Sequence, residues 1–126
     1  MYKLEELETY RAARNFRNDV ALIIRKLPKE EQYALTSQLK RSSRSIAANI
    51  SEGYGRFHFQ ENIQFCRQAR GSLFETFEHL AVAFDENYIS GEEHTAFKEK
   101  CEKLLKLLNG YIKYLKNQKA NSAKPI

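Results

Sequence analysis

Three breaks divide this chain of 126 residues into four long segments that carry the apolar spacing of helices. Pro28 follows the first segment, Gly53 to Gly55 follow the second, and the stretch from Asn87 to Gly91 follows the third. Proline lacks the N–H that a helix interior needs, whereas glycine readily takes the left-handed conformation that ends a helix. Pro28 is therefore expected in the first turn of the second helix, and Gly53 just beyond its end.

All four segments repeat apolar residues every three or four positions, which is the period of an amphipathic helix. In the fourth, Ser90-Gly91-Glu92-Glu93 has the pattern of a capping box and precedes an apolar seam from Phe97 to Leu115. Short connections favour antiparallel neighbours. The sequence therefore predicts an all-α fold, an antiparallel up-down four-helix bundle over residues 1–116, followed by a disordered basic tail at 117–126. The predicted helices span residues 4–26, 28–52, 59–84 and 91–116.

The chain has only two cysteines, Cys66 and Cys101, and neither belongs to a CxxC motif or to a cluster of cysteine and histidine. Lone thiols are typical of a reducing compartment. The N-terminus is charged from its third residue and lacks the apolar core of a signal peptide. No apolar run approaches the ~20 residues that span a bilayer. We therefore expect a cytoplasmic protein with no membrane contact.

Residue types that often carry catalysis are present, but not in catalytic patterns. The three histidines lack the spacing of metal ligands, and the serines of the second segment have no histidine in that helix to activate them. The stretch from Gly53 to Arg56 has neither the preceding strand nor the Gly-Lys-Ser/Thr ending of a phosphate loop. Glu52, Glu75 and Glu78 lack the Glu-x-x-His repeats of a di-iron bundle. We expect no enzymatic activity, no metal and no cofactor.

The formal charge of +5 is unevenly distributed along the chain. Residues 32–70 hold six basic and two acidic side chains, whereas residues 71–112 hold four basic and eight acidic ones. The last segment, 113–126, is basic again. A dipolar surface of this kind can attract phosphates, and it can also steer copies of the chain toward one another.

Basic side chains of the middle region form the candidate binding surface. The second and third helices are expected to be antiparallel neighbours, so Lys40, Arg56 and Arg67 can lie on one side of that hairpin. Phosphate contacts made there would be independent of base sequence and strongly dependent on salt. The candidate nucleic-acid-binding residues are Lys40, Arg41, Arg44, Arg56 and Arg67.

Aromatic residues beside this surface have two interpretations. Tyr54, Phe57 and Phe59 can stack on unpaired bases of RNA or DNA. Alternatively, Phe57 and Phe59 staple the entry of the third helix. Arg70 is a separate case, because it falls within the apolar arc of that helix, and we expect it to form a structural ion pair with Glu52.

The apolar arcs of the third and fourth helices cover about half of each circumference, which is more than one core stripe requires. This width favours an interface between copies of the chain, although a bundle of this size can also bury aromatic residues generously. Asn49 lies at the edge of the second helix's stripe, where a half-buried amide must find partners. We interpret it as a specificity device for the bundle or for that interface.

The residues from Leu35 to Arg56, LTSQLKRSSRSIAANISEGYGR, resemble the signature of the bacterial proteins encoded by intervening sequences in 23S ribosomal RNA genes, the S23-like family. Further matches are Pro28 to Glu31, Ala69 to Leu73 and Leu108 to Gly110. The resemblance covers nearly the whole chain up to Lys116. Its motif positions include Asn49, Glu52, Gly53, Gly55, Arg70 and Gly71.

This resemblance implies a four-helix bundle that assembles into a ring-shaped homo-oligomer, a homopentamer. The accessory variability protein of diversity-generating retroelements is similar in fold, and it forms a pentamer whose basic surface binds nucleic acid and a reverse transcriptase. Ala47 departs from the pattern because the family often has proline there, so the second helix is expected to run straighter. Phe74 and Phe77 replace a small residue and a carboxylate, which puts any polar site at that segment in doubt.

Two functions follow as hypotheses. The first is a homo-oligomeric module that binds RNA or DNA through the basic surface around Lys40, Arg41, Arg44 and Arg56. The second is a protein-interaction scaffold in which the same charges contact the acidic half, residues 71–112, of another copy. Charge reversal at the basic positions should abolish nucleic-acid binding in the first case and break the oligomer in the second.

Overall fold

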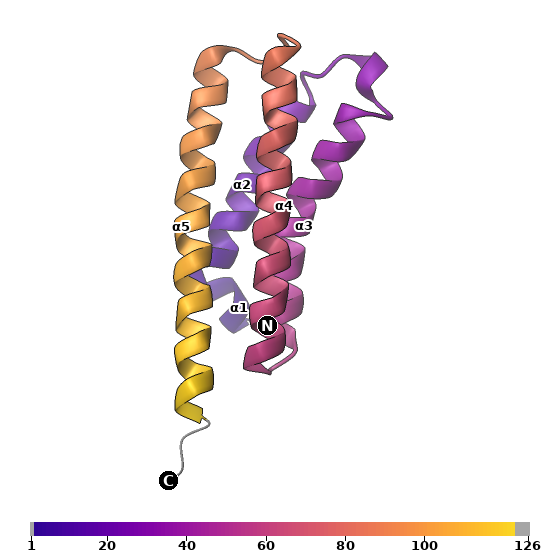
Figure 1. The fold of residues 1–126 in the computed structure, drawn as a ribbon. Helices are drawn as coiled ribbons and strands as arrows, with labels where there is room; N and C mark the ends of the chain where they lie inside the picture. Colours follow the sequence, from indigo (N-terminus) through magenta and orange to yellow (C-terminus); the bar gives the residue numbers. More distant parts are fainter. Residues whose placement is uncertain (1, 123–126) are drawn as a thin grey trace.

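The computed structural model describes residues 2–122, and every regular element in that range is helical (Figure 1). The prediction of an all-α fold is therefore confirmed. No helix in this range is both long enough and apolar enough to cross a membrane. The elements are α1 (Tyr2–Glu6), α2 (Glu8–Ile24), the 3-10 turn η1 (Lys29–Glu31), α3 (Leu35–Gly55), α4 (Phe59–Asp85) and α5 (Gly91–Ser122).

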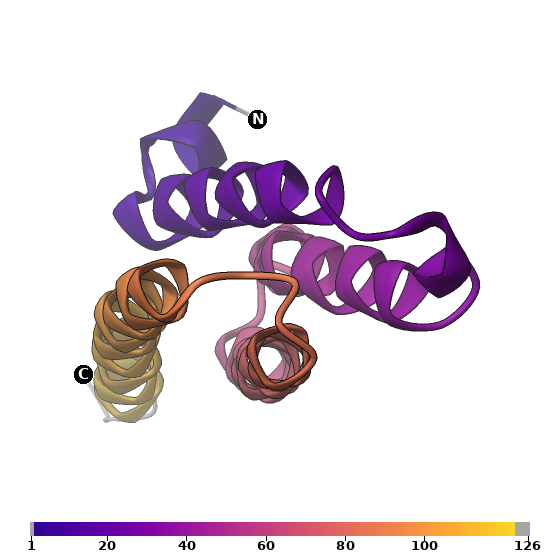
Figure 2. The ribbon, with the colours of Figure 1, turned by 90° about the horizontal axis from the view of Figure 1, so that it is seen from above.

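The four long helices contact one another in a closed ring. Helix α2 packs against α3 and α5, helix α4 packs against the same two helices from the other side, and α1 contacts α2. Seen from above, α4 and α5 run along the line of sight, whereas α2 and α3 are inclined to it (Figure 2). The contact between α2 and α3 therefore lies across the ring from the contact between α4 and α5.

Apolar stripes on the inner faces of these helices form one continuous core. Most positions of the predicted stripes are buried, and burying a Leu, Ile or Phe side chain contributes roughly 1.5–3 kcal/mol. Phe84 continues the apolar spacing of α4 but is 38% exposed at the end of that helix. The largest buried apolar side chains include Phe16, Val20, Leu39, Ile46, Ile50, Ile63, Leu73, Leu80, Leu104 and Leu108.

The capping box predicted at the start of the last helix is confirmed. The backbone N–H of Glu93 donates to Ser90 Oγ at 3.0 Å, and the backbone N–H of Ser90 donates to Glu93 Oε1 at 3.0 Å. Each side chain thus satisfies a donor that the first turn of α5 leaves free. Lys26 also bonds Glu93 Oε2 at 2.5 Å, which ties this turn to the end of α2.

The prediction that Gly53 ends the second helix is wrong. Gly53 lies inside α3, which continues to Gly55, and no described glycine has a positive φ. The physical reason for glycine here is close packing. A Cβ at Gly53 would stand 2.7 Å from Asn62 Oδ1 and 2.8 Å from Phe65 Cβ of α4. The left-handed residue that follows α3 is Phe57, with φ of 52°.

The expected start of the second helix at Pro28 is also wrong. Pro28 is extended, with ψ of 153°, and precedes the single turn η1. Helix α3 begins at Leu35, whose backbone N–H donates to Glu31 Oε1 at 3.3 Å. The carboxylate of Glu31 therefore caps α3 from the preceding turn, and the helix starts where that cap is available.

Helix α5 extends past the boundary expected at residue 116. Its last described residue is Ser122, so the first part of the predicted disordered tail is helical, and residues 123–126 lie outside the described range. Lys119 Nζ donates to Gln60 Oε1 of α4 at 2.6 Å, which anchors this extension. No proline or glycine occurs between Gly110 and Pro125 to stop the helix earlier.

Candidate nucleic-acid interface

Helices α2 and α3 form an outer groove of about 400 Å³ that four basic side chains line, and we call it the α2–α3 basic groove. Lys40 and Arg44 stand one turn apart on α3, so both project to the same side. Arg17 and Arg25 reach the groove from α2 and its C-terminal end. The remaining lining residues are Ala21, Ile24, Thr36 and Ser43.

The cations of this groove are not neutralised by the protein itself. Within residues 2–122, none of the four forms an ion pair with a carboxylate. Arg25, Lys40 and Arg44 are exposed, and Arg17 only reaches Asn18 Oδ1 at 3.5 Å. Four like charges around one groove repel one another, and an anion placed between them would relieve that repulsion.

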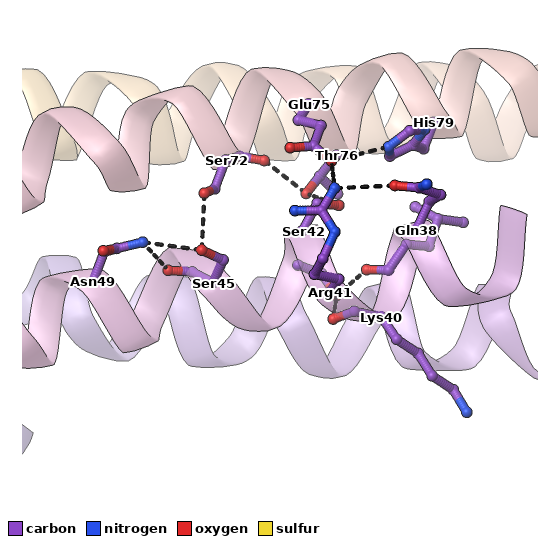
Figure 3. A network of polar contacts seen from close by, with 12 residues as sticks. Gln38, Lys40, Arg41, Ser42, Ser45, Asn49, Ser72, Glu75, Thr76 and His79 are labelled. Atoms are coloured by element: carbon purple, nitrogen blue, oxygen red, sulfur yellow. Dashed lines mark hydrogen bonds and ion pairs between the residues drawn. The ribbon is translucent and has the colours of Figure 1, made fainter. Parts of the chain in front are cut away.

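Arg41 faces a different side of α3. Its guanidinium forms an ion pair with Glu75 of α4 and donates to Gln38 Oε1 at 3.0 Å, while Lys40 points away (Figure 3). His79 Nε2 lies 3.2 Å from the same Glu75 carboxylate. Partial desolvation would raise the pKa of Glu75, but hydrogen bonds from His79 and Arg41 outweigh it and hold that pKa below 4.5. The charge of Arg41 is therefore balanced within the fold.

Arg56 is likewise engaged by neighbouring side chains. It pairs with Glu52 at 3.0 Å and with Glu61 at 4.0 Å, and its guanidinium lies 5.1 Å from the centre of the Phe65 ring. Glu52 is thus not the partner of Arg70, contrary to the sequence-based expectation. Arg70 Nη1 instead donates to Asn109 Oδ1 of α5 at 2.8 Å.

Arg67 lines a second outer groove, between α4 and α5, together with Lys116 and Lys119. This α4–α5 basic groove has a volume of about 410 Å³, and Gln60, Ile63 and Ala120 complete its lining. Helices α4 and α5 stand across the helix ring from α2 and α3 (Figure 2), so the grooves that these two pairs form lie on opposite sides of the ring. The five predicted residues therefore do not form one patch.

Sequence reasoning missed Arg17, Arg25, Lys116 and Lys119 as members of these grooves. Arg17 and Arg25 are eight residues apart, about 80° around a helix, which keeps both on one broad side of it. The spacing alone did not predict a binding groove, because the groove forms only where α2 packs on α3. The two lysines were assigned to the end of the last helix and to a tail, although their spacing of three places both on one side of a continuing helix.

The side-chain amide of Asn49 finds its hydrogen-bond partners one turn away on its own helix. Its Nδ2 donates to the Ser45 backbone oxygen at 2.8 Å and to Ser45 Oγ at 2.9 Å (Figure 3). Ser72 Oγ of α4 lies 3.0 Å from the same hydroxyl. Asn49 therefore supports the contact between α3 and α4, and among the described residues it contacts no other helix through a hydrogen bond.

A row of four hydroxyl side chains lies between α3 and α4, and we call it the hydroxyl row: Ser42, Ser45, Ser72 and Thr76. Thr76 Oγ1 lies 2.9 Å from Ser42 Oγ and 2.8 Å from the Ser72 backbone oxygen. Ser42 and Thr76 are fully buried. These small polar side chains let the two helices approach closely while each hydroxyl keeps a partner.

The remaining motif positions have simpler surroundings. A Cβ at Gly55 or at Gly71 would meet nothing within 4 Å, so packing does not require glycine at either position. Both cysteines are buried, and desolvation raises the pKa of each thiol to about 12. Neither thiol is therefore activated as a nucleophile.

Comparison with known proteins supports the fold. The model of the 23S rRNA-intervening sequence protein family matches residues 5–110. A solved structure from Bacteroides thetaiotaomicron, described as a protein with unknown function from the S23 ribosomal protein family, superposes with a TM-score of 0.76. The two chains are 24% identical, and the match covers 83% of this chain and 95% of the other. No curated protein matches this chain.

Proposed function

The chain belongs to the 23S rRNA-intervening sequence protein family, and we propose that it is a non-enzymatic, homo-oligomeric module that binds RNA or DNA in the cytoplasm. The observation that carries the proposal is the α2–α3 basic groove, whose four cations have no carboxylate partner within residues 2–122. In this proposal, the long helices form an antiparallel up-down bundle that holds these cations in place. The resemblance recognised from Leu35 to Arg56 is confirmed at the level of the family.

Phosphodiester backbones are the anions that this groove suits best. A groove with cations on both walls can accept a chain of phosphates, and each contact releases counterions from the nucleic acid. Thr36 and Ser43 also line the groove, but the Ser43 hydroxyl is buried and donates to the Leu39 backbone oxygen at 2.6 Å, so phosphate contacts from the cations dominate. We therefore expect binding that depends weakly on sequence and falls steeply as salt is raised.

Self-association is supported by the outer face of α4 and α5. Phe74 is 58% exposed beside an apolar groove of about 160 Å³ that Leu73, Phe77 and Leu105 line. Lys98 and Glu102 form the rim of this groove. An apolar centre with charged residues at its edge is the usual anatomy of a protein interface. A homopentamer is the assembly that the family resemblance suggests.

The alternative function is a scaffold whose basic groove binds another copy of the chain. The acidic half supports it, because Glu78, Glu99 and Glu102 are exposed on α4 and α5 and have no ion pair within residues 2–122. A contact between this surface and the α2–α3 basic groove would join unlike faces of neighbouring copies. Such head-to-tail contacts close into rings when the rotation allows.

Charge reversal on α3 separates these two functions. The test variant is Lys40→Glu with Arg44→Glu, and the matched control is Lys103→Glu with Lys106→Glu. The control makes the same change in net charge at exposed positions of α5 outside both basic grooves. Size-exclusion chromatography with light scattering, with and without a short RNA duplex at low and high salt, measures the oligomeric state and the formation of the complex in one experiment.

The proposed function predicts that the α3 variant remains oligomeric but no longer takes up the RNA duplex, while the control behaves like the wild type. An α3 variant that falls apart into monomers would instead favour the scaffold. Duplex uptake that survives the reversal would show that the α2–α3 basic groove is not the binding surface.

A further inference from the structure

Phe57 holds an unfavourable backbone conformation at the turn between α3 and α4. Its φ of 52° lies in the left-handed region, where the Cβ of a bulky residue crowds the backbone and glycine is the usual occupant. The side chain is 90% exposed, so burial does not compensate for this strain. An exposed, strained aromatic residue at a turn points to a role outside the fold itself.

The ring of Phe57 contributes little to the entry of α4. Its neighbour is the Tyr54 ring, at a centroid distance of 6.4 Å and a tilted angle. The first turn of α4 is capped instead by His58, whose Nδ1 accepts from the Glu61 backbone N–H at 3.4 Å. The interpretation of Phe57 as a staple for this helix is therefore not supported by its exposure.

The α4–α5 basic groove begins at the same end of the molecule as this turn. The turn and the C-terminal part of α5 lie together at the lower end of the fold (Figure 1). Gln60, three residues after Phe57, lines the groove and accepts a hydrogen bond from Lys119 at 2.6 Å. Arg67 and Lys116 supply the other two cations, and neither has a carboxylate partner within residues 2–122.

We propose that this end of the molecule binds single-stranded nucleic acid, with Phe57 stacked on an unpaired base and the strand's phosphates along the α4–α5 basic groove. Exposed aromatic rings beside a cationic groove are the common means of holding unpaired strands, because every base has a stacking face. The inference rests on the proposed function, since it requires nucleic acid as the ligand. The inference adds a second nucleic-acid-binding surface, on the opposite side of the molecule from the α2–α3 basic groove. It also assigns to this second surface a preference for unpaired strands.

Substitutions at position 57 isolate the ring from the fold. Phe57→Gly removes the ring and suits the positive φ, so the variant is expected to melt no lower than the wild type. Phe57→Tyr keeps a stacking ring and the same strain. Fluorescence anisotropy would follow the binding of a short unstructured oligouridine RNA, and of an RNA duplex of equal length, at low salt.

We expect Phe57→Gly to weaken binding of the single strand about tenfold, the size of one lost base–aromatic stack. Binding of the duplex should not change, and Phe57→Tyr should bind both like the wild type. Lys116→Glu with Lys119→Glu should also weaken single-strand binding and reduce its salt dependence. Single-strand affinity unchanged in Phe57→Gly, or an equal loss for strand and duplex, would overturn the inference.

The same titrations separate this inference from the proposed function. If the wild type binds neither RNA at low salt, both are wrong. If it binds and Lys40→Glu with Arg44→Glu abolishes duplex binding, the proposed function holds. The effect of Phe57→Gly on the single strand then decides the second surface alone.

Discussion

Arg41 of α3 forms an ion pair with Glu75 of α4, while the adjacent Lys40 points away from that contact (Figure 3). Two neighbouring cations thus serve different purposes: one joins two helices, and the other lines a groove. On one α-helix, successive side chains are about 100° apart, so adjacent positions face different neighbours. Of the two, only Lys40 is available to a ligand in the α2–α3 basic groove.

The pairing of Glu75 predicts a specific pH dependence of stability. Its pKa is lowered in the folded state, so the ionised pair stabilises the fold at neutral pH and is lost as pH falls below 4.5. Because the pair is partly exposed and screened, we expect about 0.2–1 kcal/mol at neutral pH. Urea unfolding of Glu75→Gln should show a difference from wild type that shrinks in acid, whereas Glu78→Gln should differ little at any pH.

Close packing of α3 on α4 predicts opposite effects at two glycines of one helix. Gly53→Ala places a methyl group 2.7 Å from Asn62 Oδ1 and 2.8 Å from Phe65 Cβ, and should cost about 1–3 kcal/mol. Gly55→Ala meets nothing within 4 Å and should stabilise the helix by up to about 1 kcal/mol. Thermal or urea unfolding measures both. Equal effects of the two substitutions would contradict the close approach at Gly53.

The capping box of α5 predicts a moderate loss on removing one hydroxyl. Ser90→Ala deletes the acceptor for the Glu93 backbone N–H and should lower the free energy of unfolding by about 1 kcal/mol. Ser90→Asp keeps an acceptor at the cap and should retain most of the stability. Chemical denaturation of the three proteins compares them directly, and an alanine variant as stable as wild type would contradict the cap's contribution.

The apolar outer face of α4 and α5 predicts an effect on assembly. Phe74→Glu places a charge at the centre of the proposed interface and should shift the protein toward the monomer in light scattering. Tyr33 is 90% exposed near the start of α3, away from this face, so Tyr33→Glu should leave the assembly intact. An unchanged oligomer in Phe74→Glu would place the interface elsewhere.

Apolar periodicity was sufficient to predict the helical class and most of the core. Leu39, Ile46 and Leu108 recur at helical spacing and are buried, because a stripe of apolar residues on a helix must find another apolar surface. The ends of the helices were harder to predict. A glycine in the sequence can either end a helix or allow two helices to pack closely. For Gly53, only the packing of α4 against α3 distinguishes these two roles.

The candidate site could be predicted only in part. Residues of other helices determine which of its charged side chains are paired within the fold and which remain available to a ligand. Lys40 and Arg44 stand four residues apart on one helix, and the structure places both in one groove. Arg41 was grouped with them although Glu75, far along the sequence, balances its charge. Arg17 was overlooked for the converse reason, since its groove exists only where α2 packs on α3.

The hydroxyl row has a consequence for motion. Sliding α3 along α4 by one turn would separate Ser42 from Thr76 and leave the buried Ser42 hydroxyl without its partner, at a cost of about 1–3 kcal/mol. The two helices are therefore locked in a single register and should open only together. In hydrogen–deuterium exchange, the amides in the middle of α3 and α4 should exchange last and as one cooperative unit, after those of α1 and the end of α5.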